Sequence, residues 1–321
     1  MLVLSHDDVL AALPMRDCIA AIERMFVGLA QGDYFQPLRT RAHPQGNSNW
    51  MTIMPSARIG TPRLWALKEM VVTPSNSARG KDPIQGAVLL HDGDDGRLLA
   101  VLSAPALTAI RTAAVSALAT RILARPDARS VAIIGAGVQG RAHVEAMRCV
   151  FPQACVRVWS RTQERALALA RECDAEPASS IEEALAGADV VCTVTSAREP
   201  VIARAFVAQG CHINAVGSSA STHREIDGAT MAAASLFVDR RASTLSESGD
   251  YLGALAERAI PGPRHIRAEL GEVLLGLHPG RTENTEITLF KALGLAIEDL
   301  VAAEVAVRIA RESGIGQECQ W

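Results

Sequence analysis

The sequence has no surplus of positive charge. Its 32 Lys and Arg residues face 35 Asp and Glu residues, which gives a formal net charge of −3 over 321 residues. A protein that neutralises the phosphates of a nucleic acid needs an excess of basic residues. We therefore expect no nucleic acid partner.

The sequence also lacks paired cysteine motifs and a secretion or membrane signal. The seven cysteines are odd in number and include no C-x-x-C pair, which is typical of free thiols in a reducing compartment. The N-terminus has no basic segment followed by a long apolar run, and no apolar run approaches the roughly 20 residues that span a bilayer. We expect a cytoplasmic protein without a membrane partner.

Metal-ligand spacing is missing as well. The eight histidines form no H-x-x-x-H pair. The acidic run DGDDG (92–96) lacks the ligand spacing and closing Glu of a calcium loop, so we interpret it as a hairpin turn. We expect no metal site.

The composition that remains is that of an ordinary globular enzyme. Hydrophobic residues make up 49% and charged residues 21% of the chain, with 24 Gly and 15 Pro, which excludes disordered, collagen-like and coiled-coil classes. The length exceeds the usual size of a single core, so two domains are expected.

The first part of the chain mixes helices with extended segments. Apolar residues at helical spacing predict a helix over 14–32 that ends near Gly32, and an alanine-rich helix is predicted over 104–124. The extended segments predicted between them lie at 50–54, 63–72, 84–91 and 97–102.

A different pattern begins after Pro126. Short, continuously apolar runs alternate with helix-like stretches, which is typical of a parallel sheet covered on both faces. The predicted strands lie at 130–135, 155–160, 189–194, 211–216 and 235–239. A less regular segment (240–285) precedes a long amphipathic helix predicted over 286–312. The fold class is therefore α/β, with a Rossmann-type doubly wound parallel sheet.

The sharpest local signal is a glycine-rich loop between a predicted strand and a predicted helix. It has the G-x-G-x-x-G pattern, with Gly135, Gly137, Val138, Gln139 and Gly140 as candidate cofactor contacts. Glycines permit a tight turn and a close approach to a pyrophosphate, whose charge is met by the helix N-terminus. The alternative is a simple glycine turn.

The end of the second predicted strand bears on cofactor choice. An NAD-type site presents an acidic residue there, whereas this chain has Ser160, Arg161 and Thr162. A guanidinium with two hydroxyls favours a 2′-phosphate, so NADP(H) is the preferred cofactor and NAD(H) is possible. The alternative is that Arg161 is only the solvated start of a helix.

Further candidate cofactor contacts follow the next strands. Thr193, Val194 and Thr195 end one strand, and Val216 and Gly217 end another, at the edge where a nicotinamide lies in such a sheet.

A lysine interrupts an apolar strand face. Alternation within 63–72 places Leu64, Ala66, Lys68 and Met70 on one side. Removing an ammonium from water is costly, and a desolvated lysine with a pKa near neutrality can act as a general acid or base. Equally, Lys68 could extend its ammonium to the edge of the sheet.

Arginines raise a similar question. Arg111 lies in an apolar stripe of the alanine-rich helix and needs an anionic partner, which a substrate carboxylate or a structural Asp or Glu would supply. Arg39 and Arg41, before the first clear strand, are further candidates for binding a substrate anion. Thr112, directly after Arg111, is added to the candidate cofactor contacts.

Taken together, these motifs resemble the ornithine cyclodeaminase and mu-crystallin family. The matching segments are QPLRT (36–40), MP (54–55), Lys68, AIRTAAVSALAT (109–120), IGAGVQG (134–140), NAVGS (214–218) and TLFKALGLAIEDL (288–300). The resemblance implies a discontinuous α+β domain that binds substrate and dimerises (1–118 with 284–321). A dinucleotide-binding Rossmann domain (119–283) is implied between its two parts.

The resemblance also implies roles for single residues. Lys68 matches the catalytic lysine, and Arg111 matches the arginine that holds the substrate carboxylate. Arg39 matches the first substrate arginine of the mu-crystallin-like pattern, whereas spacing to the MP pair favours Arg41, as in the cyclodeaminases. Both alignments stay open.

One departure distinguishes the reactions within the family. After the fifth predicted strand, cyclodeaminases have a motif that looks like NAVGGD, in which an aspartate serves the substrate amine. This chain instead has Ser218 and Ser219, which are candidate substrate contacts. Serine cannot balance an ammonium as a carboxylate can. The two serines and the WSRT segment (159–162) resemble the corresponding segments of mu-crystallin-like reductases.

The leading hypothesis is therefore an NAD(P)H-dependent reductase of a cyclic imine carboxylate, with Δ1-pyrroline-2-carboxylate going to proline as the favoured pair. One alternative is ornithine cyclodeaminase, which forms proline and ammonia and recycles NAD. Another is a non-catalytic NADPH-binding protein. The expected partners are a small imino-acid or amino-acid substrate and a second copy of the chain in a homodimer.

Overall fold

The computed structural model describes residues 1–320 and divides into two compact units. Unit 1 comprises Met1–Arg111 together with the chain from Leu295 onward, and unit 2 comprises Thr112–Gly294. The first boundary falls inside one continuous helix, α3 (Ala104–Leu123). The expected boundary after residue 118 lies in the same helix, where the sequence carries no signal for a division. The expected boundary after residue 283 precedes Thr288–Lys291, which form a strand in the sheet of unit 2.

Unit 1 is built on a mixed sheet. The pairs β4–β5, β5–β6 and β6–β7 are antiparallel, whereas β1 pairs with β7 in parallel. In sheet order the strands are β16 (Gln317–Glu318), β1 (Leu2–Leu4), β7 (Leu98–Ser103), β6 (Ile84–Asp92), β5 (Leu64–Val72), β4 (Trp50–Arg58) and β2 (Tyr34–Phe35), and β3 (Thr40–Ala42) also pairs with β4. The acidic run 92–96 is the turn between β6 and β7, as predicted.

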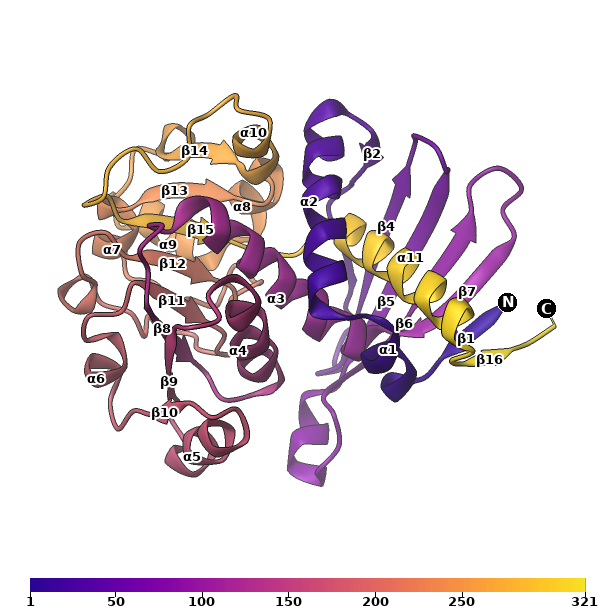
Figure 1. Cartoon of the computed structure of the whole chain (residues 1–321), viewed down its shortest axis with the longest axis horizontal. Coiled ribbons are helices and arrows are strands. Elements are labelled where there is room, and N and C mark those ends of the chain that lie inside the picture. Colours follow the sequence, from indigo (N-terminus) through magenta and orange to yellow (C-terminus); the bar gives the residue numbers. More distant parts are fainter. Residues whose placement is uncertain (321) are drawn as a thin grey trace. The chain divides into compact units, whose positions relative to one another are not determined.

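Helices from both ends of the chain pack together in unit 1. α11 (Ala296–Ser313) contacts α2 (Met15–Gln31), α1 (His6–Ala12) and strands β4, β5 and β6 (Figure 1). A short 3-10 helix, η1 (Pro74–Arg79), connects β5 to β6. α2 ends at Gly32, whose φ of 89° is a left-handed conformation that glycine adopts without strain. The predicted helix 14–32 is therefore confirmed.

Unit 2 contains an eight-stranded sheet in which every pair is parallel. Its order is β10 (Glu176–Pro177), β9 (Cys155–Trp159), β8 (Ser130–Ile134), β11 (Val190–Thr193), β12 (His212–Ala215), β15 (Thr288–Lys291), β13 (Ser235–Val238) and β14 (Ile266–Glu269). The chain leaves β8 toward β9 and later returns to its other side as β11. This reversal makes the carboxyl ends of β8 and β11 the topological switch point of a doubly wound fold.

Helices alternate with the strands of unit 2 (Figure 1). They are α4 (Val138–Val150), α5 (Gln163–Glu172), α6 (Ile181–Leu185), α7 (Gly228–Ala233), α8 (Arg241–Glu247), α9 (Gly249–Ala256) and α10 (Leu270–Leu274), with 3-10 turns η2 (Arg204–Phe206) and η3 (Pro263–His265). The central strands are fully buried, as their continuously apolar sequences predicted.

The prediction of one helix over 286–312 was wrong. Residues Thr288–Lys291 form β15, which lies between β12 and β13, and the helix begins only at Ala296. The run from Ile287 to Phe290 is short and, apart from Thr288, apolar. Periodicity cannot distinguish a buried strand from a buried helix over such a length.

α3 is the one helix among residues 1–320 that is long and apolar enough, by length and composition, to cross a membrane. About three quarters of its apolar window (78%) is buried inside the protein. A core helix of a globular protein meets the same criterion, and its alanine-rich sequence suits close packing on several sides.

Candidate active site

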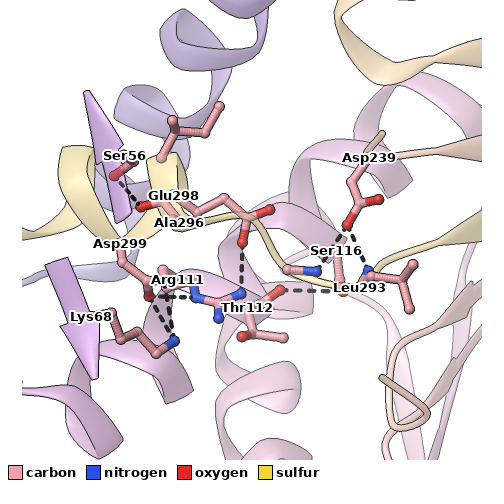
Figure 2. Close-up of polar contacts among 12 residues, drawn as sticks. Ser56, Lys68, Arg111, Thr112, Ser116, Asp239, Leu293, Ala296, Glu298 and Asp299 are labelled. Carbon is pink, nitrogen blue, oxygen red and sulfur yellow. Dashed lines mark hydrogen bonds and ion pairs between the residues drawn. The ribbon is translucent and has the colours of Figure 1, made fainter. Parts of the chain in front are cut away.

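A buried ion pair in unit 1 joins Lys68 to the C-terminal helix (Figure 2). Lys68 lies on the inward face of β5 with Leu64 and Ala66, as predicted, and its side chain is only 1% exposed. Its Nζ lies 3.0 Å and 3.1 Å from the two carboxylate oxygens of Asp299 in α11. The lysine therefore does not reach the solvent at the sheet edge.

Arg111 joins the same cluster from α3. Its Nε donates to Asp299 Oδ1 at 2.9 Å, and its Nη1 donates to Glu298 Oε2 at 2.6 Å (Figure 2). Both carboxylates are fully buried. Structural carboxylates thus supply the anionic partner that the sequence demanded, and Nη2 is the guanidinium nitrogen that takes part in neither contact.

Burial and charge tune the lysine. Burial lowers the pKa of Lys68, the positive charge of Arg111 lowers it further, and Asp299 opposes both, with a resulting value of about 8. A lysine with a pKa near neutrality can lose and regain a proton at physiological pH. Lys68 therefore has the properties of a general acid or base.

The start of α11 is fixed by side chains from the sheet side of unit 1. Ser56 Oγ donates to the carbonyl of Ala296 at 3.1 Å, and the amide of Ile297 donates to Gln36 Oε1 at 3.0 Å. These bonds fix the first turn of the helix, and with it the carboxylates of Glu298 and Asp299.

The two candidate arginines of the N-terminal segment have different surroundings. Arg39 is half-buried, and its charge is close enough to contribute to lowering the pKa of Lys68. Arg41 lies on β3 and is exposed. The structure therefore places the charge of Arg39 where it acts on Lys68, whereas Arg41 is exposed on β3.

In unit 2 the glycine-rich loop fits a dinucleotide. Gly135 has a φ of 125°, and a Cβ there would lie 2.7 Å from the carbonyl oxygen of Val194, while a Cβ on Gly140 would overlap the Gly135 carbonyl. Gly137 is the N-cap of α4, without a side-chain cap, and apart from its chain neighbours no atom of the described residues lies within 4 Å of where its Cβ would be. This open position at the N-terminus of α4 suits the close approach of a pyrophosphate. Val138, which begins the helix, is exposed, and Gln139 is half-buried.

The end of β9 carries the residues expected to select the cofactor. Arg161 and Thr162 are exposed, Ser160 is half-buried, and the amide of Thr162 donates to Ser160 Oγ at 3.4 Å. Thr162 is also the N-cap of α5 and makes no side-chain cap bond. Hydroxyl, guanidinium and helix N-terminus together provide donors for a phosphate.

The ends of β11 and β12 are tied together by a carboxylate that the sequence did not suggest. Glu225 Oε2 accepts from Thr193 Oγ1 at 2.8 Å and from the amide of Gly217 at 2.7 Å. Its Oε1 accepts from the amide and hydroxyl of Thr195 at 2.6 Å and 2.7 Å. The hydroxyls of both threonines therefore support the strand ends, while Val194 and Val216 contribute backbone there.

The family model for the ornithine cyclodeaminase/mu-crystallin family matches residues 1–313. The chain belongs to this family. Ketimine reductase mu-crystallin of Mus musculus is 41% identical over 276 residues, which is 85% of each chain.

Two solved structures are similar to this protein over the whole chain. Thermococcus litoralis Δ1-pyrroline-2-carboxylate reductase, in complex with NADH and L-proline, superposes with a TM-score of 0.94 at 35% identity and covers 99% of this chain and 100% of that one. An archaeal alanine dehydrogenase dimer with bound NAD gives a TM-score of 0.93 at 28% identity, with 100% and 99% covered.

Two serines mark the point where this family member departs from the cyclodeaminase pattern. Ser218 is buried, and its hydroxyl donates to the carbonyl oxygens of His223 and Ala220. Ser219 is half-buried. The Ser218 hydroxyl therefore holds its own loop.

Sequence reasoning missed Glu298, Asp299 and Glu225. Glu298 and Asp299 stand in the first turn of α11, where acidic residues are ordinarily explained by the helix dipole. The available signal was their position beside the buried Ile297 and Leu300, because a carboxylate on an apolar helix face requires a cation.

Proposed function

We propose that the chain is an NAD(P)H-dependent reductase of a cyclic imine carboxylate, with Δ1-pyrroline-2-carboxylate and proline as the favoured pair. The observation that carries this proposal is the buried Lys68, paired with Asp299 and held near a pKa of 8. Relatives that are named ketimine reductase and pyrroline-2-carboxylate reductase support it.

The proposal gives each charged residue of the cluster a part. Lys68 donates its proton to the imine nitrogen, which makes the imine carbon electrophilic, and Asp299 keeps the Nζ in place. The hydride for that carbon would come from a reduced nicotinamide, when the cofactor is bound. We assign the substrate carboxylate to Arg39, whose positive charge acts on Lys68, and to Arg111 Nη2, which takes part in neither of the contacts of Arg111 with Glu298 and Asp299.

NADP(H) is the proposed cofactor, with NAD(H) as the second choice. Support comes from the exposed Arg161 beside Ser160 and Thr162 at the end of β9. Gly135, Gly137 and Gly140 would hold the pyrophosphate against the N-terminus of α4.

A homodimer is proposed for the assembly. The archaeal alanine dehydrogenase is a dimer, and unit 1 exposes the apolar side chains of Phe35 (47%) and Trp65 (50%), whose ring centroids are 6.2 Å apart. Sedimentation equilibrium of the wild type and of Trp65→Arg would test it. A monomeric wild type contradicts the proposal. We also propose a cytoplasmic location, because no disulfide joins the seven cysteines, all of which lie within residues 1–320.

The reaction is tested with two parallel assays of purified protein. NADPH with Δ1-pyrroline-2-carboxylate is followed by loss of nicotinamide absorbance, and ornithine with NAD is followed by release of ammonia. The proposal expects turnover in the first assay. Ammonia without net consumption of cofactor would establish a cyclodeaminase, and tight NADPH binding without turnover would establish a binding protein.

A further inference from the structure

Three buried charges in unit 2 have no part in the reaction described above. Glu225 lies in the loop after β12, Asp250 lies in α9, and Lys291 ends β15, and each is fully buried. Burying an ionised group is costly unless it is paired and hydrogen-bonded. The burial of three such groups near the carboxyl ends of the strands therefore requires a specific explanation.

The three side chains form a connected network. Asp250 Oδ1 accepts from the amides of Glu225 and Ile226 at 2.6 Å and 2.9 Å, and Asp250 Oδ2 lies 2.9 Å from Lys291 Nζ. Lys291 Nζ also donates to the carbonyl of Ser218 at 2.8 Å. The loop from Gly217 to Ile226 is thus held at one end by Lys291 and at the other by Asp250.

Glu225 extends the network to the neighbouring strand. Its carboxylate binds the amide of Gly217 and both donors of Thr195, which follow β12 and β11 respectively. A Cβ on Gly217 would lie 2.5 Å from Glu225 Oε1 and would overlap the backbone of Thr195. The two strand ends and the carboxylate are packed so closely that none can shift independently.

The topology of the sheet determines which half of a dinucleotide this network faces. In a doubly wound sheet the pyrophosphate lies at the loop after the first strand, and the adenosine ribose lies at the end of the second. Here these are the ends of β8 and β9, and β11 and β12 follow β8 on the other side. The nicotinamide half therefore belongs over the ends of β11 and β12.

We propose that Glu225, Asp250 and Lys291 are positioning residues that fix the strand ends around Thr195 and Gly217 for the nicotinamide half of the cofactor. The inference rests on the proposed dinucleotide site but not on the identity of the imine substrate. None of the three needs to touch the cofactor, because they act through the backbone of the residues that they hold.

The test compares two ligands by isothermal titration calorimetry on the full-length protein. NADPH carries both halves of the dinucleotide, whereas 2′-phospho-ADP-ribose lacks the nicotinamide. Lys291→Met should weaken NADPH binding about tenfold, the size expected when a buried hydrogen-bond partner is removed, and leave the affinity for the fragment within twofold of wild type. Glu225→Gln should act in the same direction, because its amide group would face the donors of Thr195 or Gly217.

A charge-balanced variant separates positioning from folding. Lys291→Met leaves Asp250 buried without its cation, whereas Lys291→Met combined with Asp250→Asn removes both charges. We expect the double variant to recover Tm but to keep the weakened NADPH binding, because the bond to the Ser218 carbonyl is still lost. If NADPH affinity recovers together with Tm, the network is only structural and the proposal is overturned.

A control of the same kind exists at the opposite end of β11. Asp189 immediately precedes that strand, pairs with Arg125 at 2.5 Å and accepts from the amides of Arg129 and Ser130. Asp189→Asn should lower Tm while both ligands bind as in wild type. Equal weakening of NADPH and fragment binding in Lys291→Met, or no weakening of either, contradicts the inference. A wild type that binds NADPH but reduces no imine contradicts only the proposed reaction.

Discussion

Lys68 and Asp299 lie 231 positions apart in the sequence, yet their side chains form an ion pair of 3.0 Å in which each is only 1% exposed. The pair connects the middle of β5 with the first turn of α11, and Arg111 completes it from α3. Burial lowers the pKa of the lysine to about 8, so this property of Lys68 depends on contacts between segments that are far apart in the chain.

The first prediction concerns the proton donor. Lys68→Met should lower kcat at least about 100-fold, the smaller end of the usual range for loss of a general acid, while NADPH affinity stays within about twofold. Steady-state kinetics and calorimetry measure the two quantities. Lys81→Met, at an exposed lysine, is the control and should match wild type. Equal loss of turnover and of cofactor affinity would mean that Lys68 is structural.

The second prediction concerns pH. In the proposed reaction protonated Lys68 is the acid, so kcat/KM should fall as the pH rises through about 8. Asp299 raises the pKa of Lys68, so Asp299→Asn should move the descending limb to lower pH. Profiles of kcat/KM from pH 6 to 10 test both statements. A limb that stays in place, or moves upward, in Asp299→Asn would contradict the assignment.

The same pKa shift has an opposite consequence for stability. The pKa of Lys68 is about 8 in the folded protein and 10.5 for an ordinary lysine, so between these values the unfolded chain binds more protons. The contribution of Lys68 to the free energy of unfolding therefore increases with pH over that window. Denaturant titrations of wild type and Lys68→Met at pH 7.5 and pH 10 should show this difference between the two proteins.

The third prediction distinguishes two neighbouring arginines. Arg39→Ala should raise KM for the imine carboxylate about tenfold or more, because Arg39 adds positive charge near Lys68. Arg41→Ala should change KM less than about twofold, because Arg41 is exposed on β3. Each variant is the control for the other, and the reverse ranking would favour the cyclodeaminase-like alignment.

The fourth prediction concerns the 2′-phosphate. Arg161→Ala should raise KM for NADPH about tenfold and leave KM for NADH nearly unchanged. Arg165→Ala, at an exposed arginine in the first turn of α5, controls for the loss of surface charge. If both cofactors are affected alike in Arg161→Ala, the arginine does not select between them.

Local sequence patterns predicted those parts of the fold in which each strand or helix has its own recognisable pattern. The parallel sheet of unit 2 follows from continuously apolar strands, and the fit of Gly135 and Gly140 follows from the motif, because both depend on residues close in sequence. β15 was not predicted, because a short apolar run carries no period that separates strand from helix.

The sequence by itself determined the α/β class, the dinucleotide loop and the presence of a lysine on the apolar face of β5. Only the tertiary structure decided that Asp299 and Glu298 neutralise Lys68 and Arg111, and that Glu225 fastens two strand ends. The physical reason is that apolar neighbours in the sequence indicate that a charged side chain is buried, and burial of a charge costs free energy. The partner that offsets this cost is selected by distance in space, which a linear sequence does not record.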